Sequence, residues 1–514
     1  MIGVVVLLFL GLPIVFNFAV DLLWFDSQQL SSVYTTRLSV QGLVFIATLL
    51  IAATFLLVNL LIARRGSVPR QLFPGQELNV SPNQFRALVW AVAILFGIFF
   101  ALGAAGNWEN VLRFLNASSF GNTDPIFNED IGFYVFTLPF YDALRGWFSA
   151  LLLVTIIAVA AVYISGARLV GREGTTITLP SILGGREPIV IPIAVPNAMR
   201  VHLSILAALY LATFAIGYRL DQYKLLFSDH SVLYGADYTD INAKLPGYWI
   251  LLVVASISAL LLLLNIRFRT LTLLGGAIAL WIVAAILVGA VYPGIVENFI
   301  VKPSQISLEA PYITNNITAT RQAFNLNSIA VRADNIQPLS QADIAASPQT
   351  IANIRLWDYK PLLKTYNQRQ SLETYYDFTD VDIDRYTITG NYRQVMLAPR
   401  ELNTDGLPAG AQTWVNRTLQ YTHGYGTALS PVNEIGPGGQ PNYFISGVPP
   451  TSTVGLTISR PEIYFGERQS NYIIVNTGQP EFDYHSSTTG EVHTTYTGTA
   501  GVAMDSFWKK ALFA

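Results

Sequence analysis

The residue best placed to do chemistry is His423, in the segment YTHGYG at 421–426. Glycines let the backbone turn tightly beside a polar cluster, and Glu434 follows eleven residues later. His423 could therefore act as a general base, with Glu434 orienting its ring. The alternative is a structural turn in which His423 caps the carbonyl end of a preceding helix. We take His423 and Glu434 as the catalytic candidates.

Three carboxylates at alternate positions form a second candidate: Asp380, Asp382 and Asp384. Alternate residues of a strand point to the same side, so their oxygens could bind a cation. No glycine-bearing calcium-loop spacing accompanies them, and a solvated edge strand explains them equally simply. Three arginines could read an anionic headgroup or a glycan, or could be scattered surface charges: Arg393, Arg400 and Arg417.

Several kinds of active site are excluded by the sequence. The chain has no cysteine, which rules out disulfides, thiolate metal sites and cysteine nucleophiles. It has no HExxH, no GxSxG and no GxxxxGK(S/T). His485 and His493 are eight residues apart in a stretch rich in Ser, Thr and Gly, a spacing typical of a solvated loop. We therefore expect no cofactor and, apart from the three aspartates, no metal ligands.

The chain that carries these residues divides into an apolar N-terminal part and a polar C-terminal part. The chain of 514 residues is 52% hydrophobic and 12% charged, where a soluble chain would be about a quarter charged. A membrane-spanning helix needs about 20 mainly apolar residues. Seven runs qualify, at 2–20, 42–62, 87–105, 147–164, 201–218, 248–264 and 271–291. The last 220 or so residues contain none.

The distribution of arginine and lysine predicts the direction of these spans. Cytoplasmic loops carry the excess of positive charge. The loops at 64–86, 166–200 and 267–270 hold ten arginines, whereas the longer loops at 21–41, 106–146 and 219–247 hold six basic residues and most of the acids. The first set should be cytoplasmic. This places the N-terminus inside and the C-terminal region outside.

The C-terminal region reads as a water-facing domain. Helical patterns occur at 315–326, 342–356, 360–376 and 411–421, and strand patterns at 385–397 and 471–475. The sequence thus predicts an all-α bundle of seven transmembrane helices at 1–291 and an extracytoplasmic α+β domain at 292–514. A net charge of −2 gives no field that would attract nucleic acid.

Long motifs along the whole chain carry a family resemblance. They are LWFD at 23–26, DPIFNEDIGFYVF at 124–136, NIRLWDY at 353–359, DRYTI at 384–388, QTWVN at 412–416, YTHGYG at 421–426 and SPVNE at 430–434. In these motifs the chain resembles the bacterial integral membrane proteins of uncharacterised protein family 0182. The resemblance implies several membrane helices before a large extracytoplasmic region. It assigns no activity and no site residue. Members of the family usually continue well beyond the region matching SFWK at 506–509, so we expect the outer domain here to be incomplete.

Three functions remain open. The first is a non-enzymatic envelope protein whose outer domain binds another envelope protein, a lipid or a glycan, as a scaffold or assembly factor. The second is a membrane-bound enzyme acting on an envelope lipid or polysaccharide through His423 and Glu434. The third is a carrier of an uncharged or lipid-like substrate, because the spans contain almost no ionisable residues. All three place the chain in a lipid bilayer.

Overall fold

A computed structural model describes residues 2–66, 82–166, 176–179, 189–192, 197–230, 234–268, 270–333, 335, 337–468 and 472–513. The chain forms two compact units. One comprises Met1–Val331 together with Val502–Ala514, and the other comprises Arg332–Gly501. The prediction that residues 1–291 lie in the membrane and residues 292–514 outside it stays a prediction.

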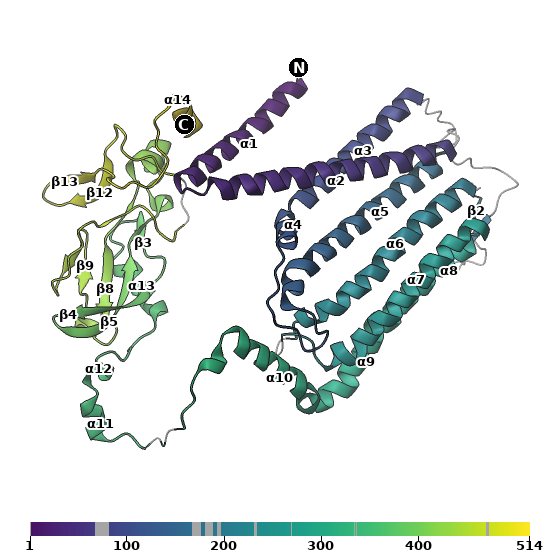
Figure 1. The fold of residues 1–514 in the computed structure, drawn as a ribbon. Helices are drawn as coiled ribbons and strands as arrows, with labels where there is room; N and C mark the ends of the chain where they lie inside the picture. The colour runs from purple at the N-terminus through teal and green to yellow at the C-terminus, as the bar shows by residue number, and fades with distance from the viewer. Residues whose placement is uncertain are drawn as a thin grey trace. The chain divides into compact units, whose positions relative to one another are not determined.

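The first unit is a helical bundle (Figure 1). Among the described residues, six helical stretches are long and apolar enough to cross a membrane. They contain α2 (Ser31–Gly66), α3 (Pro82–Ala105), α5 (Leu138–Gly166), α6 (Asn197–Lys224), α7 (Leu245–Phe268) and α8 (Leu271–Ile286). The prediction of several membrane helices is confirmed. The first apolar run lies in a helix, α1 (Ile2–Ser27), which is not one of the six, so the count of seven stays a prediction.

Shorter elements complete this unit. They are α4 (Trp108–Leu115), β1 (Thr176–Leu179), β2 (Ile189–Pro192), α9 (Tyr292–Val296), α10 (Gln305–Ala323) and α14 (Phe507–Phe513). Within the described residues of this unit, four π-helical segments interrupt the long helices: η1 (Phe133–Thr137), η3 (Asp240–Lys244), η4 (Leu287–Val291) and η5 (Glu297–Val301). Single π-turns of this kind are rare and often occur at functional sites.

A buried hydrogen-bonded group links three of the long helices. Asn59 on α2 lies with its Oδ1 2.9 Å from Nε2 of His202 on α6, and the hydroxyl of Tyr163 on α5 lies 3.3 Å from the other ring nitrogen. Asn59 also donates to the Phe55 carbonyl one turn earlier. Because lipid offers no alternative partners, such contacts hold helices in register. His202 is thus an interhelical contact rather than a headgroup-facing side chain.

Two aspartates fold the loop that carries the DPIFNED motif. Asp124 accepts hydrogen bonds from the backbone N–H groups of Ile126, Phe127 and Glu129. Asp130 accepts from three further backbone N–H groups and from the Ser119 hydroxyl. The Ser119 hydrogen bond is the largest cause that lowers the pKa of Asp130 to about 2. This motif is therefore explained by local folding of the loop.

The second unit is built on antiparallel strands. Its largest sheet has the order β10–β9–β8–β5–β4 (Figure 1). The strands are β4 (Asp382–Ile388), β5 (Asn391–Pro399), β8 (Thr427–Pro431), β9 (Ile445–Ser446) and β10 (Thr451–Ser452). Three smaller pairs are β3 (Tyr376–Asp377) with β6 (Glu401–Leu402), β7 (Gly424–Tyr425) with β11 (Glu462–Ile463), and β12 (Glu481–Ser486) with β13 (Gly490–Thr494). The C-terminal region thus contains small antiparallel sheets, as an α+β arrangement requires.

One helix covers the large sheet. Helix α13 (Tyr359–Arg369) buries Leu362 and Tyr366 against Met396 and Ala398 of β5. The Tyr366 hydroxyl lies 2.7 Å from the Ser430 hydroxyl and 3.1 Å from the carbonyl oxygen of Met396, so the ring is buried without an unsatisfied polar group. Two short helices precede it, α11 (Gln341–Ala346) and α12 (Pro348–Ile351).

Two predicted strands of this region are wrong in detail. The segment 385–397 is a hairpin, because Thr389 and Gly390 take φ of 48° and 83° and form a two-residue turn between β4 and β5. No strand forms at 472–475, the described part of the segment 471–475. The predicted helix at 411–421 is shorter than expected and ends in a π-turn, η10 (Asn416–Gln420).

Candidate functional site

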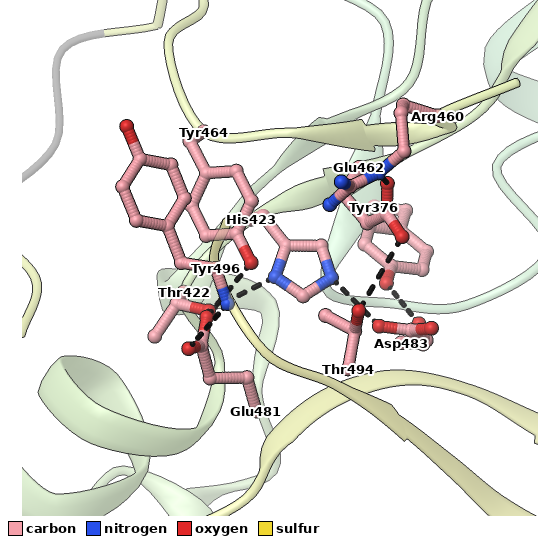
Figure 2. A network of polar contacts seen from close by, with 10 residues as sticks. All are labelled: Tyr376, Thr422, His423, Arg460, Glu462, Tyr464, Glu481, Asp483, Thr494 and Tyr496. Atoms are coloured by element: carbon pink, nitrogen blue, oxygen red, sulfur yellow. Dashed lines mark hydrogen bonds and ion pairs between the residues drawn. The ribbon is translucent and has the colours of Figure 1, made fainter. Parts of the chain in front are cut away.

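His423 lies in the residues between η10 and the short strand β7, at the centre of a buried polar network (Figure 2). Its side chain is 0% exposed. Both ring nitrogens have partners: Nε2 lies 3.0 Å from Oδ1 of Asp483, and Nδ1 lies 2.9 Å from the hydroxyl of Thr422. The imidazole is therefore fixed from both sides.

Strand β12 supplies the carboxylates of this network. Glu481 and Asp483 are two residues apart, and both reach the network, Glu481 through Thr422 and Asp483 through His423. The pairing of β12 with β13 shifts register at Asp483, a bulge of the kind that redirects a side chain. Glu481 accepts hydrogen bonds from the hydroxyls of Thr422 and Tyr464, at 2.9 and 2.8 Å, and from two backbone N–H groups.

The hydrogen-bond partners indicate which atoms of the ring donate. The Thr422 hydroxyl has one proton to share between Glu481 and His423. If it donates to the carboxylate of Glu481, it must accept a proton from Nδ1 of His423. Nε2 faces the carboxylate of Asp483, which as an anion can only accept. These partners suit a ring that donates from both nitrogens, to Asp483 and to the Thr422 hydroxyl.

Aromatic side chains enclose the network. The ring of Tyr464 lies 4.8 Å from that of His423, centroid to centroid. Burial raises the pKa of Tyr464, and its hydrogen bond to Glu481 adds to the effect. Tyr376 donates to the backbone carbonyl of Asp483 at 2.5 Å, and burial raises its pKa as well. The hydroxyl of Thr422, the imidazole of His423 and the carboxylate of Asp483 follow one another as in a catalytic triad. All three side chains are buried, so none is open to a substrate.

The glycines of YTHGYG hold this segment against its neighbours. A Cβ on Gly424 would lie 2.3 Å from the carbonyl oxygen of Arg400, so only glycine permits the approach. Gly426 has a φ of +71°, in the left-handed region. Its N–H donates to the Pro461 carbonyl at 2.8 Å. The motif is thus a close backbone crossing that delivers His423 to β12.

Glu434 does not meet His423 in a hydrogen bond or ion pair. Its carboxylate accepts from the guanidinium of Arg393 and, at 2.7 Å, from the amide of Asn442. Partial burial opposes its ionisation, but Arg393 and Asn442 hold the pKa of Glu434 below its usual value. The carboxylate partner of His423 is Asp483, and the predicted pairing of His423 with Glu434 is not the one that the structure shows.

The three aspartates do not converge. Asp380 and Asp382 are exposed, and Asp384 is half-buried. The Oδ1 atoms of Asp380 and Asp384 accept hydrogen bonds from the next backbone N–H. Among the described residues, the group of three His or acidic side chains close enough to hold a metal lies elsewhere, in the helical unit. This arrangement is what a solvated strand would show.

Arg400 is not a surface residue. It is fully buried, donates to the carbonyls of Gln370 and Tyr425, and lies over the ring of Phe378 with 5.3 Å between guanidinium carbon and ring centroid. Burial lowers the pKa of Arg400 to about 10. The interpretation as a scattered surface charge is wrong for this residue, which instead supports the backbone around the His423 segment.

Sequence reasoning found His423 but missed Asp483 and Glu481. They lie 60 and 58 residues further along the chain. The signal that was available is the pattern EFDYH at 481–485, in which two acids alternate with aromatic residues. Acids that share the buried side of a strand need partners, and a buried histidine is a suitable one.

Comparison with known proteins identifies the relatives of this chain. The model of the Uncharacterised protein family (UPF0182) matches residues 1–514. A UPF0182 protein of Desulforamulus reducens is 37% identical over 518 residues, covering 96% of this chain and 54% of the relative. One of Trichlorobacter lovleyi is 40% identical over 507 residues, with the same coverage. One of Trichodesmium erythraeum is 37% identical over 497 residues.

No solved structure matches this chain. The chain spans about half the length of the curated relatives that it matches. The family match covers every motif described above, and the long apolar helices agree with what the resemblance implies. This chain belongs to the uncharacterised protein family UPF0182.

Proposed function

We propose that this chain is a non-enzymatic membrane protein of the bacterial envelope. Its bundle anchors a domain outside the membrane, and that domain binds another envelope protein, a lipid or a glycan as a scaffold or assembly factor. The observation that carries this proposal is the complete burial of His423 with both ring nitrogens engaged. The residue best suited to general-base chemistry is committed to holding strands together.

The distribution of charge supports a location outside the membrane. Arg64 and Arg65 end the long helix α2, and positive charge marks the cytoplasmic end. From there, α3, α5, α6, α7 and α8 cross in turn, so the C-terminal unit emerges on the opposite side. This reasoning does not depend on whether α1 also spans the bilayer.

Cysteine labelling would test this sidedness. The natural chain has no cysteine, so single substitutions can be labelled without background. In intact cells or spheroplasts, a membrane-impermeant maleimide should label Thr488→Cys and Asn116→Cys, which are exposed. Ser67→Cys, in a loop predicted to be cytoplasmic, should be labelled only after permeabilisation. Labelling of Ser67→Cys and protection of Thr488→Cys in intact cells would reverse the proposed orientation.

Binding would be tested by purification and cross-linking from native membranes. Exposed aromatic residues of the outer unit, Trp414 and Phe465, would carry a photoreactive phenylalanine. We expect a discrete cross-linked product at one of them and a companion that stays bound in mild detergent at constant stoichiometry. A chain that purifies alone, with no bound lipid or protein and no cross-link, would count against the scaffold role.

A further inference from the structure

A second polar cluster lies in the helical unit, away from the His423 network. It is formed by His230 and Asp237, in the residues that connect α6 to α7, and by Asp240, the first residue of η3. One ligand atom from each residue lies within 4.8 Å of the other two. We call these three residues the His230 cluster.

The distances within the His230 cluster are close to those between ligands of one metal ion. His230 Nδ1 lies 3.4 Å from Asp237 Oδ2, and Nε2 lies 3.0 Å from Asp240 Oδ2. Two ligands that each lie about 2.1 Å from a zinc ion are separated by about 3.0 to 3.4 Å at octahedral or tetrahedral angles. Only one ring nitrogen of His230 would bind the ion. The carboxylate oxygen at the other nitrogen would therefore have to move closer to the binding nitrogen by about 1.5 Å or less.

Asp240 is fully buried, and its two carboxylate oxygens have different partners. Oδ2 lies 3.0 Å from His230 Nε2, and Oδ1 lies 2.7 Å from the ammonium of Lys244 as an ion pair but accepts no hydrogen bond. A carboxylate oxygen can accept more than one partner, so Oδ1 keeps lone-pair capacity that the ion pair does not use.

The surroundings of the cluster add more negative charge. Glu309 on α10 is 7% exposed, and both of its carboxylate oxygens point at the N–H of Tyr238, at 3.3 and 3.1 Å. Glu297, the first residue of η5, accepts a hydrogen bond from Thr239 at 2.7 Å. Four carboxylates thus lie on or against residues 237–240, and Lys244 is the ammonium that pairs with one of them. A divalent cation would compensate more of this charge than Lys244 does alone.

We propose that His230, Asp237 and Asp240 bind a divalent transition-metal ion, with Zn²⁺ as the preferred ion. An imidazole with two carboxylates suits Zn²⁺, whereas Ca²⁺ and Mg²⁺ prefer oxygen ligands throughout. Glu309 and Glu297 lie around the ligands and would hold α10 and η5 against the loop before α7. The ion would therefore fix the segment by which the chain leaves the bundle.

Metal binding by the purified full chain in detergent would test this. After treatment with a chelator and dialysis, the protein should take up about one Zn²⁺ per chain, and calorimetry with Zn²⁺ alone should show one strong site. His230→Ala and Asp240→Asn should each weaken binding by more than about 10-fold, since ligand loss exceeds the effect of losing an outer partner. His485→Ala, at an exposed histidine of β12, is the matched control and should bind as the natural chain does.

A second readout is independent of binding curves. Zn²⁺ should slow amide hydrogen exchange in α10 of the natural chain but not in His230→Gln. This variant keeps a polar side chain at position 230 and can serve as the test if Asp240→Asn fails to fold. Uptake of no zinc by the natural chain, or uptake unchanged in both His230 variants, would overturn the proposal. Equal binding of Ca²⁺ and Zn²⁺ would also overturn it, because an imidazole ligand would then contribute nothing.

Discussion

Replacing His423 by alanine should destabilise the outer unit by about 3 to 5 kcal/mol, the range found when one partner of a buried ion pair is removed. Asp483, which is 5% exposed, would lose its His423 partner. The expected result is a large rise in amide exchange of β7 and β12, measured by mass spectrometry on the full chain in detergent. The bundle helices should be unaffected.

A double-mutant cycle shows whether the two residues act as a pair. His423→Ala combined with Asp483→Ala should cost much less than the two single variants added together, because neither charge is then left alone. The matched control is His485→Ala, at an exposed histidine on the strand that carries Asp483. It should change the free energy of unfolding by no more than about 0.5 kcal/mol. Additive losses in the cycle would contradict a buried His423–Asp483 ion pair.

Gly424→Ala should lower the stability of the same unit by about 3 kcal/mol or more. The added Cβ would lie 2.3 Å from the carbonyl oxygen of Arg400 and 2.8 Å from the Cα of Glu401. Both contacts are with backbone, so relief requires moving a strand rather than a side chain, the costly form of overpacking. The midpoint of thermal aggregation, followed by size-exclusion chromatography of the purified chain, should fall by several degrees.

A second glycine provides the control for this prediction. A Cβ on Gly410 meets no atom within 4 Å, and its φ is not positive. Gly410→Ala should be neutral or should stabilise by up to about 1 kcal/mol, because alanine reduces the freedom of the unfolded chain. Equal midpoints for Gly424→Ala and Gly410→Ala would show that the crossing at Gly424 can widen without cost.

The bundle was largely predictable because its signal is local. A spanning helix satisfies its own backbone hydrogen bonds, so apolar length alone identifies it. The contacts between helices were less accessible. His202 lies near the end of an apolar run, yet its ring lies 2.9 Å from Oδ1 of Asn59 on another helix. The sequence does not show which way a side chain near a helix end points.

The outer site was predictable in one residue and not in its partners. YTHGYG marks His423 because glycines punctuate a tight backbone path, and that signal is local. Glu434 was chosen because it is close in sequence, whereas the observed partner, Asp483, is brought in by strand β12 from 60 residues away. Thr389 shows the same limit at a turn: threonine rarely takes a positive φ, so the hairpin was read as one strand.

The bond between Asn59 and His202 has a consequence for the order of synthesis. Its two residues are 143 positions apart. At about 5 to 20 residues per second, a ribosome needs on the order of ten seconds to make the intervening chain. During that interval α2 exists without α6. The amide nitrogen of Asn59 can keep its bond to the Phe55 carbonyl within α2, whereas the amide oxygen gains its His202 partner only when α6 has been made.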